Sequence, residues 1–394
     1  MLAPQSPWLT ILLGALTAMT ALGIDMILPA LPALAGAFAV GTDRIQLTLS
    51  LFILGYAGGQ LIYGPLSDRF GRRPMLLIGT AVYMASGLAC AASPSIEVLV
   101  VARFVQGLGG CAGPVLARAV IRDHHSGRRA SQMLSYITLV FALAPLVAPL
   151  IGAALLERFG WPAIFWCLSG LGLLLWLGVV VGFGESLRDP DPRAAEVTRM
   201  VANTVAFFAN GVSLRSALVN GFVFAGLFAF ISGSPFVLID VYQISPQHFG
   251  LYFALSALGL MLGAVTNSRL LRYRSGDWVM RFGLWVLLAS GGAVLLIASG
   301  RWGGALLLVA PIVTYVFAQG LVLPNAIAAA MEPLPYMAGT AASLVGAIQM
   351  IGGSLSGYAV NALYDRSPLP MAATIALMGA CAFVTRWLLP PKIS

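Results

Sequence analysis

The sequence contains very few charged residues for its length. Only 9% of its 394 residues are Asp, Glu, Lys or Arg, whereas 59% are hydrophobic. A soluble protein of this size does not need so many apolar side chains to fill its core. The composition therefore excludes a soluble globular protein and predicts a chain that lies in a membrane.

Cysteine and histidine are also scarce. The four cysteines lie inside apolar stretches without metal-site or disulfide spacing, which is typical of packing residues. The sequence has no paired carboxylates or histidine cluster at one depth, as a membrane enzyme would need, and no repeated selectivity elements, as a channel would need. We therefore expect neither an enzyme nor a bound metal or cofactor.

Lysine is nearly absent, because 21 of the 22 basic residues are arginine and the formal net charge is +8. These arginines do not form a nucleic-acid-binding stripe but lie in loops between apolar runs, and arginine-rich loops alternate with arginine-poor ones. By the positive-inside rule, the arginine-rich side is cytoplasmic. The pattern predicts a multi-pass protein of a bacterial inner membrane with both termini in the cytoplasm and no nucleic-acid partner. No positive segment precedes the first apolar run, so we expect that run to remain as a span.

Long apolar runs recur twelve times along the chain. A helix needs about 20 apolar residues to cross the hydrocarbon layer. Windows of that length predict an all-α membrane protein with twelve transmembrane helices in two six-helix halves. The predicted spans are 9–33, 45–66, 75–93, 97–118, 132–155, 162–183, 217–240, 246–268, 279–299, 303–328, 338–362 and 369–389.

The most polar segment, residues 185–215, separates the two sets of spans. We interpret it as a cytoplasmic linker between an N-terminal half, residues 1–184, and a C-terminal half, residues 216–394. Residues 201–208 are apolar between flanking arginines, which favours a short amphipathic helix on the membrane surface. Two halves joined in this way are typical of structural repeats around a central site.

The loop after the second span carries the most specific pattern, GPLSDRFGRRPML at residues 64–76. Its glycines permit a tight turn, and the carboxylate of Asp68 is favoured near the N-terminal end of a neighbouring helix. Arg72 can reach a second acid, for which Asp123 is the candidate. We predict a cluster that stabilises one conformation and opens in the other; alternatively, the charges only anchor the loop. Its members are Gly64, Asp68, Arg69, Gly71, Arg72, Arg73 and Asp123.

This pattern resembles the cytoplasmic signature of the major facilitator superfamily. Span four contains Arg103 and Gln106 followed by small residues, which is similar to that family's second signature. An arginine inside a span costs about 2.5 to 3.5 kcal/mol on insertion scales, so it should face a partner or a wet cavity. Alternatively, Arg103 snorkels to the outer end of its span.

Span five resembles the signature of the antiporters in this superfamily. Prolines there remove backbone hydrogen bonds and bend the helix, and small residues allow close packing. The family pattern has glycines where this chain has alanines, so small residues are retained in place of the glycines themselves. The matching residues are Ala144, Pro145, Ala148, Pro149 and Gly152.

Span one contains a second costly group, Asp25, in the pattern Asp-Met-x-x-Pro-x-x-Pro. A carboxylic acid in a partly wet cavity can take up and release a proton near neutral pH. With the other signatures, this pattern resembles the Bcr/CflA drug:proton antiporters, which export bicyclomycin, phenicols and other compounds. Some members carry an earlier acid in span one, where this chain has Thr17, so the proton coupling is assigned to Asp25 with Arg103 as its tuning partner.

The resemblance implies proton-coupled efflux of small drug-like molecules by alternating access, driven by the proton gradient without a cofactor. The alternative is import or export of a metabolite such as a nucleoside, an amino acid or a sugar. We expect a monomer in the lipid bilayer that binds protons and a small-molecule substrate. Candidates for the substrate cavity are Asp25, Gln106, Phe224, Phe228, Tyr315, Gln319 and Gln349.

Overall fold

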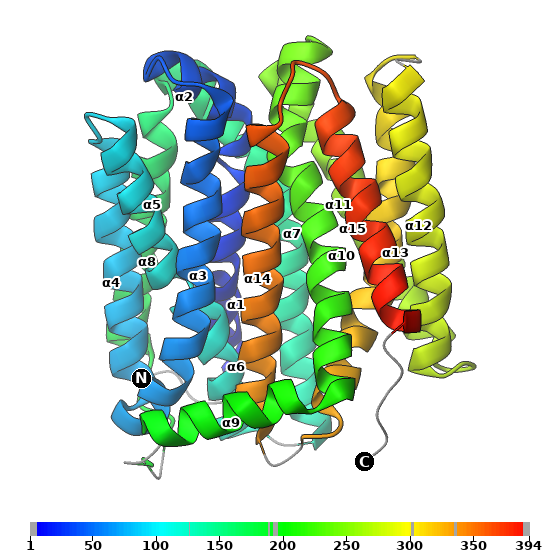
Figure 1. Ribbon diagram of the computed structural model, residues 1–394. Coiled ribbons are helices and arrows are strands. Elements are labelled where there is room, and N and C mark those ends of the chain that lie inside the picture. The colour runs from blue at the N-terminus through cyan, green and yellow to red at the C-terminus, as the bar shows by residue number, and fades with distance from the viewer. Residues whose placement is uncertain are drawn as a thin grey trace. The chain divides into compact units, whose positions relative to one another are not determined.

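The computed structural model describes residues 6–125, 127–187, 190–191, 196–300, 303–334 and 337–388, which are helical along most of their length (Figure 1). Every predicted span coincides with one or more of these helices. In chain order the elements are α1 (Pro7–Asp25), η1 (Leu28–Ala30), α2 (Leu31–Ala37), α3 (Thr42–Phe70), α4 (Arg72–Ala91), α5 (Ile96–Gly110), α6 (Ala112–His124), α7 (Gly127–Phe159), α8 (Pro162–Gly182), α9 (Val197–Ala209), α10 (Gly211–Pro235), η2 (Phe236–Val241), α11 (Pro246–Leu270), α12 (Gly276–Gly300), α13 (Ala305–Met331), α14 (Ala338–Ala362) and α15 (Leu369–Leu388).

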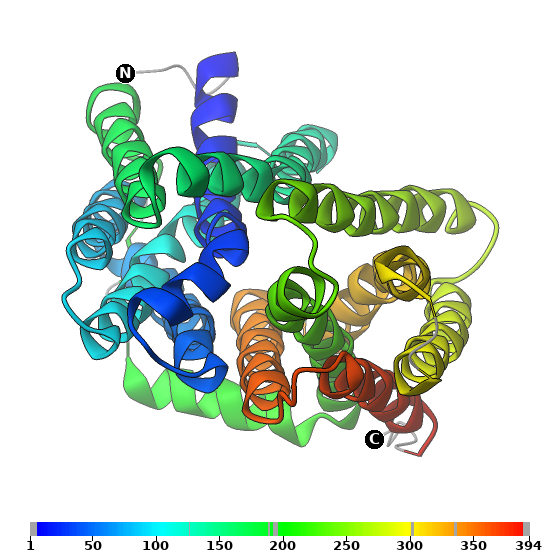
Figure 2. The same cartoon turned by 90° about the horizontal axis from the view of Figure 1, so that it is seen from above.

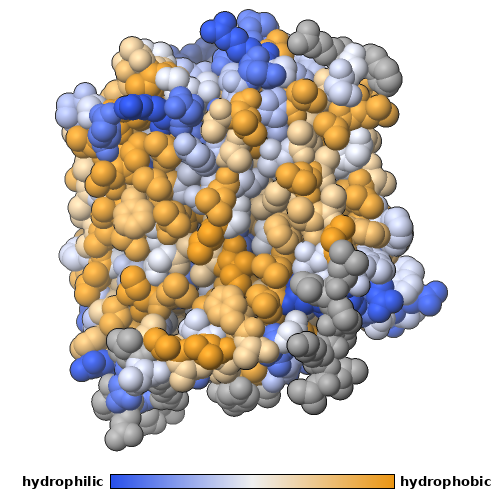
Figure 3. All heavy atoms as spheres, viewed as in Figure 1, coloured by the Kyte–Doolittle hydropathy of each residue, from blue (hydrophilic) through white to orange (hydrophobic). Residues whose placement is uncertain are grey.

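Eleven segments in the described part of the chain are long and apolar enough to cross a membrane. The remaining predicted span, 132–155, lies within α7, a helix of 33 residues. On the face drawn in Figure 3, hydrophobic residues cover the helices between their ends, as contact with lipid requires. The all-α, multi-pass class predicted from the sequence is therefore confirmed.

The chain divides into two compact units. Unit 1 comprises Met1–Ala30 and Leu51–Met200, and unit 2 comprises Leu31–Ser50 and Val201–Ser394. Residues 31–50 belong to unit 2 because α2 packs against η2 and the Ser354 hydroxyl donates a 2.8 Å hydrogen bond to the carbonyl of Ser50. The first turns of α3 are thus part of one unit and the rest of that helix is part of the other.

Glycine allows two helices of unit 1 to approach each other closely. A Cβ on Gly55 of α3 would collide with the carbonyl of Phe104, and a Cβ on Gly107 of α5 would collide with the carbonyl of Phe52. Because these neighbours are backbone atoms, no rotamer change could relieve the clash. The contact fixes α5, and with it Arg103, against α3.

Unit 2 is built around α10, which packs against α13, α14 and α15. Helix α12 packs against both α13 and α15, as the view along the helix axes in Figure 2 shows. Helix α10 begins at Gly211 because Asn210 caps it by accepting a 3.0 Å hydrogen bond from the Ser213 N–H. The helix therefore takes up the last residues of the predicted linker, and Arg215 lies within α10.

Within unit 2, helix α9 runs across the ends of α10 and α14 instead of parallel to them (Figure 1). It covers the segment for which an amphipathic helix was predicted. Phe207 is fully buried in a cluster with Ala217 of α10 and Ala341 of α14. On another face of α9, Val201 and Val205 are exposed. The helix thus has one apolar face on the protein and a second that is uncovered.

Candidate functional site

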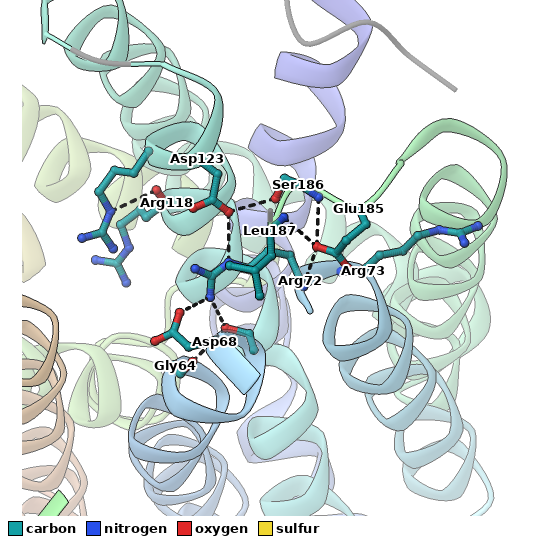
Figure 4. A network of polar contacts seen from close by, with 11 residues as sticks. Gly64, Asp68, Arg72, Arg73, Arg118, Asp123, Glu185, Ser186 and Leu187 are labelled. Carbon is teal, nitrogen blue, oxygen red and sulfur yellow. Dashed lines mark hydrogen bonds and ion pairs between the residues drawn. The ribbon is translucent and has the colours of Figure 1, made fainter. Parts of the chain in front are cut away.

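Arg72, the first residue of α4, joins two carboxylates from different helices (Figure 4). Its Nη1 donates to Asp68 Oδ1 at 2.5 Å on the last turn of α3, and its Nε donates to Asp123 Oδ2 at 3.0 Å on the last turn of α6. Nη1 also donates to Ser67 Oγ at 2.6 Å. Arg72 is buried, whereas the side chain of Asp68 is 48% exposed. The guanidinium therefore holds the ends of α3, α4 and α6 together.

The turn between α3 and α4 places Arg72 in this position. Gly71 has a φ of 100°, a conformation that residues with a Cβ rarely adopt. The hydroxyl of Ser67 donates to the carbonyl of Gly64 one turn earlier in α3, so its oxygen is oriented toward Arg72. Both predicted glycines therefore contribute through their backbone: Gly71 by its positive φ and Gly64 by the carbonyl that orients Ser67.

Glu185 completes the cluster and was not predicted from the sequence. It follows α8, and its carboxylate accepts hydrogen bonds from the backbone N–H groups of Arg72 at 2.9 Å and Arg73 at 3.1 Å. It also accepts from the N–H groups of Ser186 and Leu187. Gly71 offers no side chain to cap α4, so a distant carboxylate satisfies these N–H groups at the positive end of the helix.

Ser186 links this carboxylate to the arginine network, because its hydroxyl donates to Asp123 Oδ2 at 2.9 Å (Figure 4). Both Glu185 and Ser186 lie in the predicted linker, residues 185–215. One signal could have found them: an acid next to the end of a span, on the same membrane side as a helix start without a capping side chain.

The side chains of the other two predicted arginines of the cluster form no described hydrogen bond or ion pair with its carboxylates; Arg73 contacts Glu185 only through its backbone N–H. Arg73 Nη2 donates to the carbonyl of Val180 at 2.9 Å and so ties α4 to the end of α8. Arg69 is exposed, and its guanidinium lies 5.0 Å from the ring centroid of its neighbour Phe70. Arg72 is therefore the arginine of this loop whose side chain joins the carboxylates of Asp68 and Asp123.

Arg103 is fully buried in unit 1, at 0% exposure, so the alternative that it snorkels to the membrane surface is wrong. Its Nη1 donates to Gln106 Oε1 at 2.7 Å, and its Nη2 donates to the carbonyl of Gly23 at 2.9 Å. The guanidinium also lies 4.1 Å from the ring centroid of Phe52, in cation–π contact. These bonds fix the cation near the end of α1.

Asp25 is the last residue of α1 and is 4% exposed. The carbonyl that Arg103 binds lies only two residues earlier, so the structure brings the two predicted coupling residues to the same end of α1. Gln106, a predicted cavity residue, is part of the same group, and its Nε2 has no hydrogen-bond partner among the described residues. The site therefore contains a buried acid, a buried cation and an amide with an open donor.

The predicted antiporter residues lie on α7 and pack on α1. Ala144 is buried against Ala18 and Ala21, and a Cβ on Gly152 would collide with the carbonyl of Met26, the residue after Asp25. Pro145 and Pro149 lie inside the helix between these two contacts. The small-residue face of α7 thus reaches the end of α1 that carries the acid.

The remaining predicted cavity residues belong to unit 2. The rings of Phe224 and Phe228 pack with centroids 4.9 Å apart on α10. Gln319 of α13 donates through Nε2 to the carbonyl of Val223 at 2.9 Å. Tyr315 is buried one turn away, and its hydroxyl lies against Gly226, while Gln349 of α14 is half-buried.

Asn220 of α10, another polar residue that the sequence offers for a cavity, shares this region. Both polar atoms of its amide are buried without a hydrogen-bond partner in the described chain, as are the Tyr315 hydroxyl and Gln319 Oε1. Open hydrogen-bonding groups in an apolar interior are costly, so they favour a site for water or a polar ligand. The side chains of Asn220, Tyr315 and Gln319 are all uncharged, so any ligand of this region would be bound through hydrogen bonds.

We predict that Glu185→Gln lowers the free energy of unfolding by about 0.5 to 1 kcal/mol, because the amide removes the negative charge at the N-terminal end of α4. Gly71→Ala should cost more, since its Cβ would collide with the Glu185 carboxylate and its φ would be strained. The midpoint of thermal unfolding in detergent measures both effects. Glu157→Gln, an exposed acid on α7, is the control. Equal midpoints for Glu185→Gln and Glu157→Gln would contradict the capping role.

Comparison with known proteins agrees with this architecture. Residues 13–357 match the family described as the Major Facilitator Superfamily. The chain is 35% identical to an uncharacterized MFS-type transporter, YdgK, of Bacillus subtilis, with 95% of this chain and 94% of that protein covered. It is 33% identical to a bicyclomycin resistance protein homolog of Haemophilus influenzae, covering 95% of this chain and 93% of the relative. The crystal structure of a D-xylose-proton symporter superposes with a TM-score of 0.75 at 15% identity, covering 98% of each chain. The chain therefore belongs to the Major Facilitator Superfamily of membrane transporters.

Proposed function

We propose that this transporter exports small drug-like molecules, of the bicyclomycin or phenicol type or a wider range, in exchange for protons. The observation that carries the proposal is that Asp25 and Arg103 are both buried near the end of α1, with the proline-containing helix α7 packed against the same end. The name of the Haemophilus influenzae relative supports a drug as the cargo. The alternative cargo is a metabolite such as a nucleoside, an amino acid or a sugar.

In this proposal Asp25 carries the proton. It is the only acid well inside a predicted span of the first half, and an ionised acid in that environment costs about 2.5 to 3.5 kcal/mol on insertion scales. Arg103 cannot follow a moving carboxylate freely, because Gln106 and the Gly23 carbonyl hold its guanidinium. Binding of a proton to Asp25 therefore removes a buried negative charge two residues from the carbonyl that holds the fixed guanidinium. This change in local electrostatics favours a different packing of α1 and α7.

The Arg72 cluster governs which conformation the protein occupies. Its bonds join α3, α4, α6 and the segment after α8 at one end of unit 1. A movement that separates α3 from α6 must break at least one ion pair of a buried guanidinium, which is unfavourable unless another partner replaces it. The Arg72 cluster, which we call the latch, therefore stabilises one conformation and is not part of the substrate site.

We further propose that the protein works as a monomer in the bacterial inner membrane, with both termini and the segment that contains α9 in the cytoplasm. The arginine-rich loops support this orientation. The proton gradient supplies the free energy, and no cofactor is needed. The Arg72 cluster then lies on the cytoplasmic side.

Transport into inverted membrane vesicles tests the function. Vesicles loaded with a pH-sensitive dye should accumulate bicyclomycin or chloramphenicol from a compound panel and lose protons from the lumen as they do so. Collapse of the pH gradient with an uncoupler should abolish accumulation. Accumulation of only nucleosides, amino acids or sugars would favour the metabolite alternative, and transport unaffected by the uncoupler would overturn proton exchange.

For the latch, we predict that Asp68→Asn and Arg72→Ala each reduce transport by at least about tenfold, the equivalent of about 1.4 kcal/mol. Substrate affinity in detergent should change little, because these residues do not line the proposed substrate site. Arg69→Ala, which removes an exposed arginine of the same loop, is the control and should transport normally. Normal transport by both latch variants would mean that the charges only anchor the loop.

For the coupling site, we predict that adding substrate to the purified protein releases protons and that Asp25→Asn abolishes this release. The amide imitates the protonated acid, so substrate affinity should no longer depend on pH. Arg103→Ala should raise the pH at which coupling fails, because loss of the buried positive charge at the same end of α1 lets Asp25 hold its proton more tightly. Asp43→Asn, an exposed acid at the start of α3, is the control. Unchanged proton release from Asp25→Asn would assign the proton to another residue.

A further inference from the structure

Two buried polar side chains of unit 1 meet at Gly87 of α4. A Cβ on Gly87 would collide with the hydroxyl of Ser169 on α8 and would lie 3.0 Å from Gln106 Nε2 on α5. Ser169 is 3% exposed and Gln106 is fully buried. Neither Ser169 Oγ nor Gln106 Nε2 has a hydrogen-bond partner among the described residues. Three helices thus leave two open polar groups around one missing Cβ.

Arg103 determines which way the Gln106 amide faces. A guanidinium has hydrogen-bond donors only, so the amide oxygen must accept from Arg103 Nη1, as it does at 2.7 Å. The Nε2 group of Gln106 then lies on the side of Gly87. A reversed amide would present its N–H groups to the guanidinium and lose this bond. The group that receives the Nε2–H therefore helps to keep Arg103 in place.

The space over Gly87 suits a water molecule. A Cβ there would meet only the ends of the two polar side chains and the Cβ of Ser169, the latter at an ordinary contact distance of 3.5 Å. Helix α8 carries no charged residue, and those of α4 are its first two, Arg72 and Arg73. No carboxylate on these helices could neutralise a cation, whereas water needs only two to four polar partners.

The residues next to Gly87 and Ser169 lack these features. The hydroxyl of Ser86 donates to the carbonyl of Val82 at 2.6 Å, which is the usual bond of a serine inside a helix. A Cβ on Gly170 would meet no atom within 4 Å. Ser86 and Gly170 are therefore matched controls for Ser169 and Gly87.

We propose that a water molecule binds over Gly87 between Gln106 and Ser169, and that Ser169 thereby acts as a positioning residue for Arg103. The water accepts the Nε2–H of Gln106 and donates to the Ser169 hydroxyl. This bridge fixes the amide, whose oxygen in turn holds the guanidinium. The role of Ser169 rests on the proposed function, in which Arg103 tunes Asp25, whereas the water site does not depend on the cargo.

The titration of Asp25 reports where Arg103 lies. Asp25 is the only charged residue of α1. Tyr83 and Cys90 of α4 are within electrostatic reach of Arg103, but both residue types are neutral in water near pH 7. Glu97, the other charged residue of α5, is exposed. A change in the position of the guanidinium should therefore appear in the pH dependence that belongs to Asp25.

The test is the pH midpoint of chloramphenicol affinity, measured on the purified full chain in detergent. Ser169→Ala removes a partner of the water, and Gly87→Ala fills its space. Each should lower the midpoint by about half a pH unit, because a guanidinium that Gln106 no longer holds can turn toward ionised Asp25. Ser86→Ala and Gly170→Ala should titrate as wild type does. In a Gln106→Ala background, Ser169→Ala should cause no further shift.

Three outcomes of this titration would overturn the proposal. An unchanged midpoint in Ser169→Ala would remove its positioning role, and a shift with Ser169→Ala but not with Gly87→Ala would exclude the water. An additional shift in the Gln106→Ala background would mean that Ser169 does not act through Gln106.

A second measurement separates this inference from the proposed function. If chloramphenicol affinity in wild type does not depend on pH, the assigned coupling is wrong, but the midpoints of thermal unfolding still test the water bridge. The combined Ser169→Ala and Gln106→Ala variant should lose less than the two single losses added together, because both remove the same bridge. Additive losses would overturn the bridge whatever the protein transports.

Discussion

The cost of a charge in an apolar interior determines where the chemistry of this protein lies. The chain has few charged residues, and three arginines with little exposure are held by specific partners: Arg72 by two carboxylates, Arg103 by Gln106 and a backbone carbonyl, and Arg386 by Asp277. Each guanidinium joins at least two elements, because one partner alone would leave some of its N–H groups open. The same bonds that lower the cost of burial therefore also fix the relative positions of the helix ends.

Asp25 differs from these arginines in a way that matters for mechanism. A guanidinium remains charged throughout the physiological range, so its partners can be permanent. A carboxylic acid can lose its charge by binding a proton, and its environment then changes without any movement of heavy atoms. A buried acid is thus the natural place for an electrostatic change, while the arginines hold the surrounding helices in place.

Much of the fold could be predicted from the sequence because apolar length is a local property. The windows at 45–66 and 246–268, for example, lie inside α3 and α11. Helix ends were less predictable: α3 continues through Pro65 to Phe70, and α10 begins six residues before its predicted span, at Gly211. These extensions depend on capping and on packing between helices, which hydropathy does not measure.

In the candidate site, too, contacts marked by a local sequence pattern were predicted and contacts between distant residues were not. Asp68, Arg72 and Asp123 were found because a dense local pattern marks the first two and places the third within reach. The contacts of Glu185 and Asp277 were not predicted. Glu185 lies more than a hundred residues from Arg72, and Asp277 lies more than a hundred residues from Arg386, so no local pattern connects them. Arg281, four residues from Asp277, could have been found from helical spacing alone.

Glu185 also constrains how the chain can vary in length. Its carboxylate must reach the start of α4 while Ser186 reaches Asp123, so the backbone between α8 and Leu187 has a fixed course. An inserted or deleted residue between Gly182 and Ser186 would move one of these groups away from its partner. Relatives that keep this arrangement should therefore keep the same number of residues between the end of α8 and Leu187.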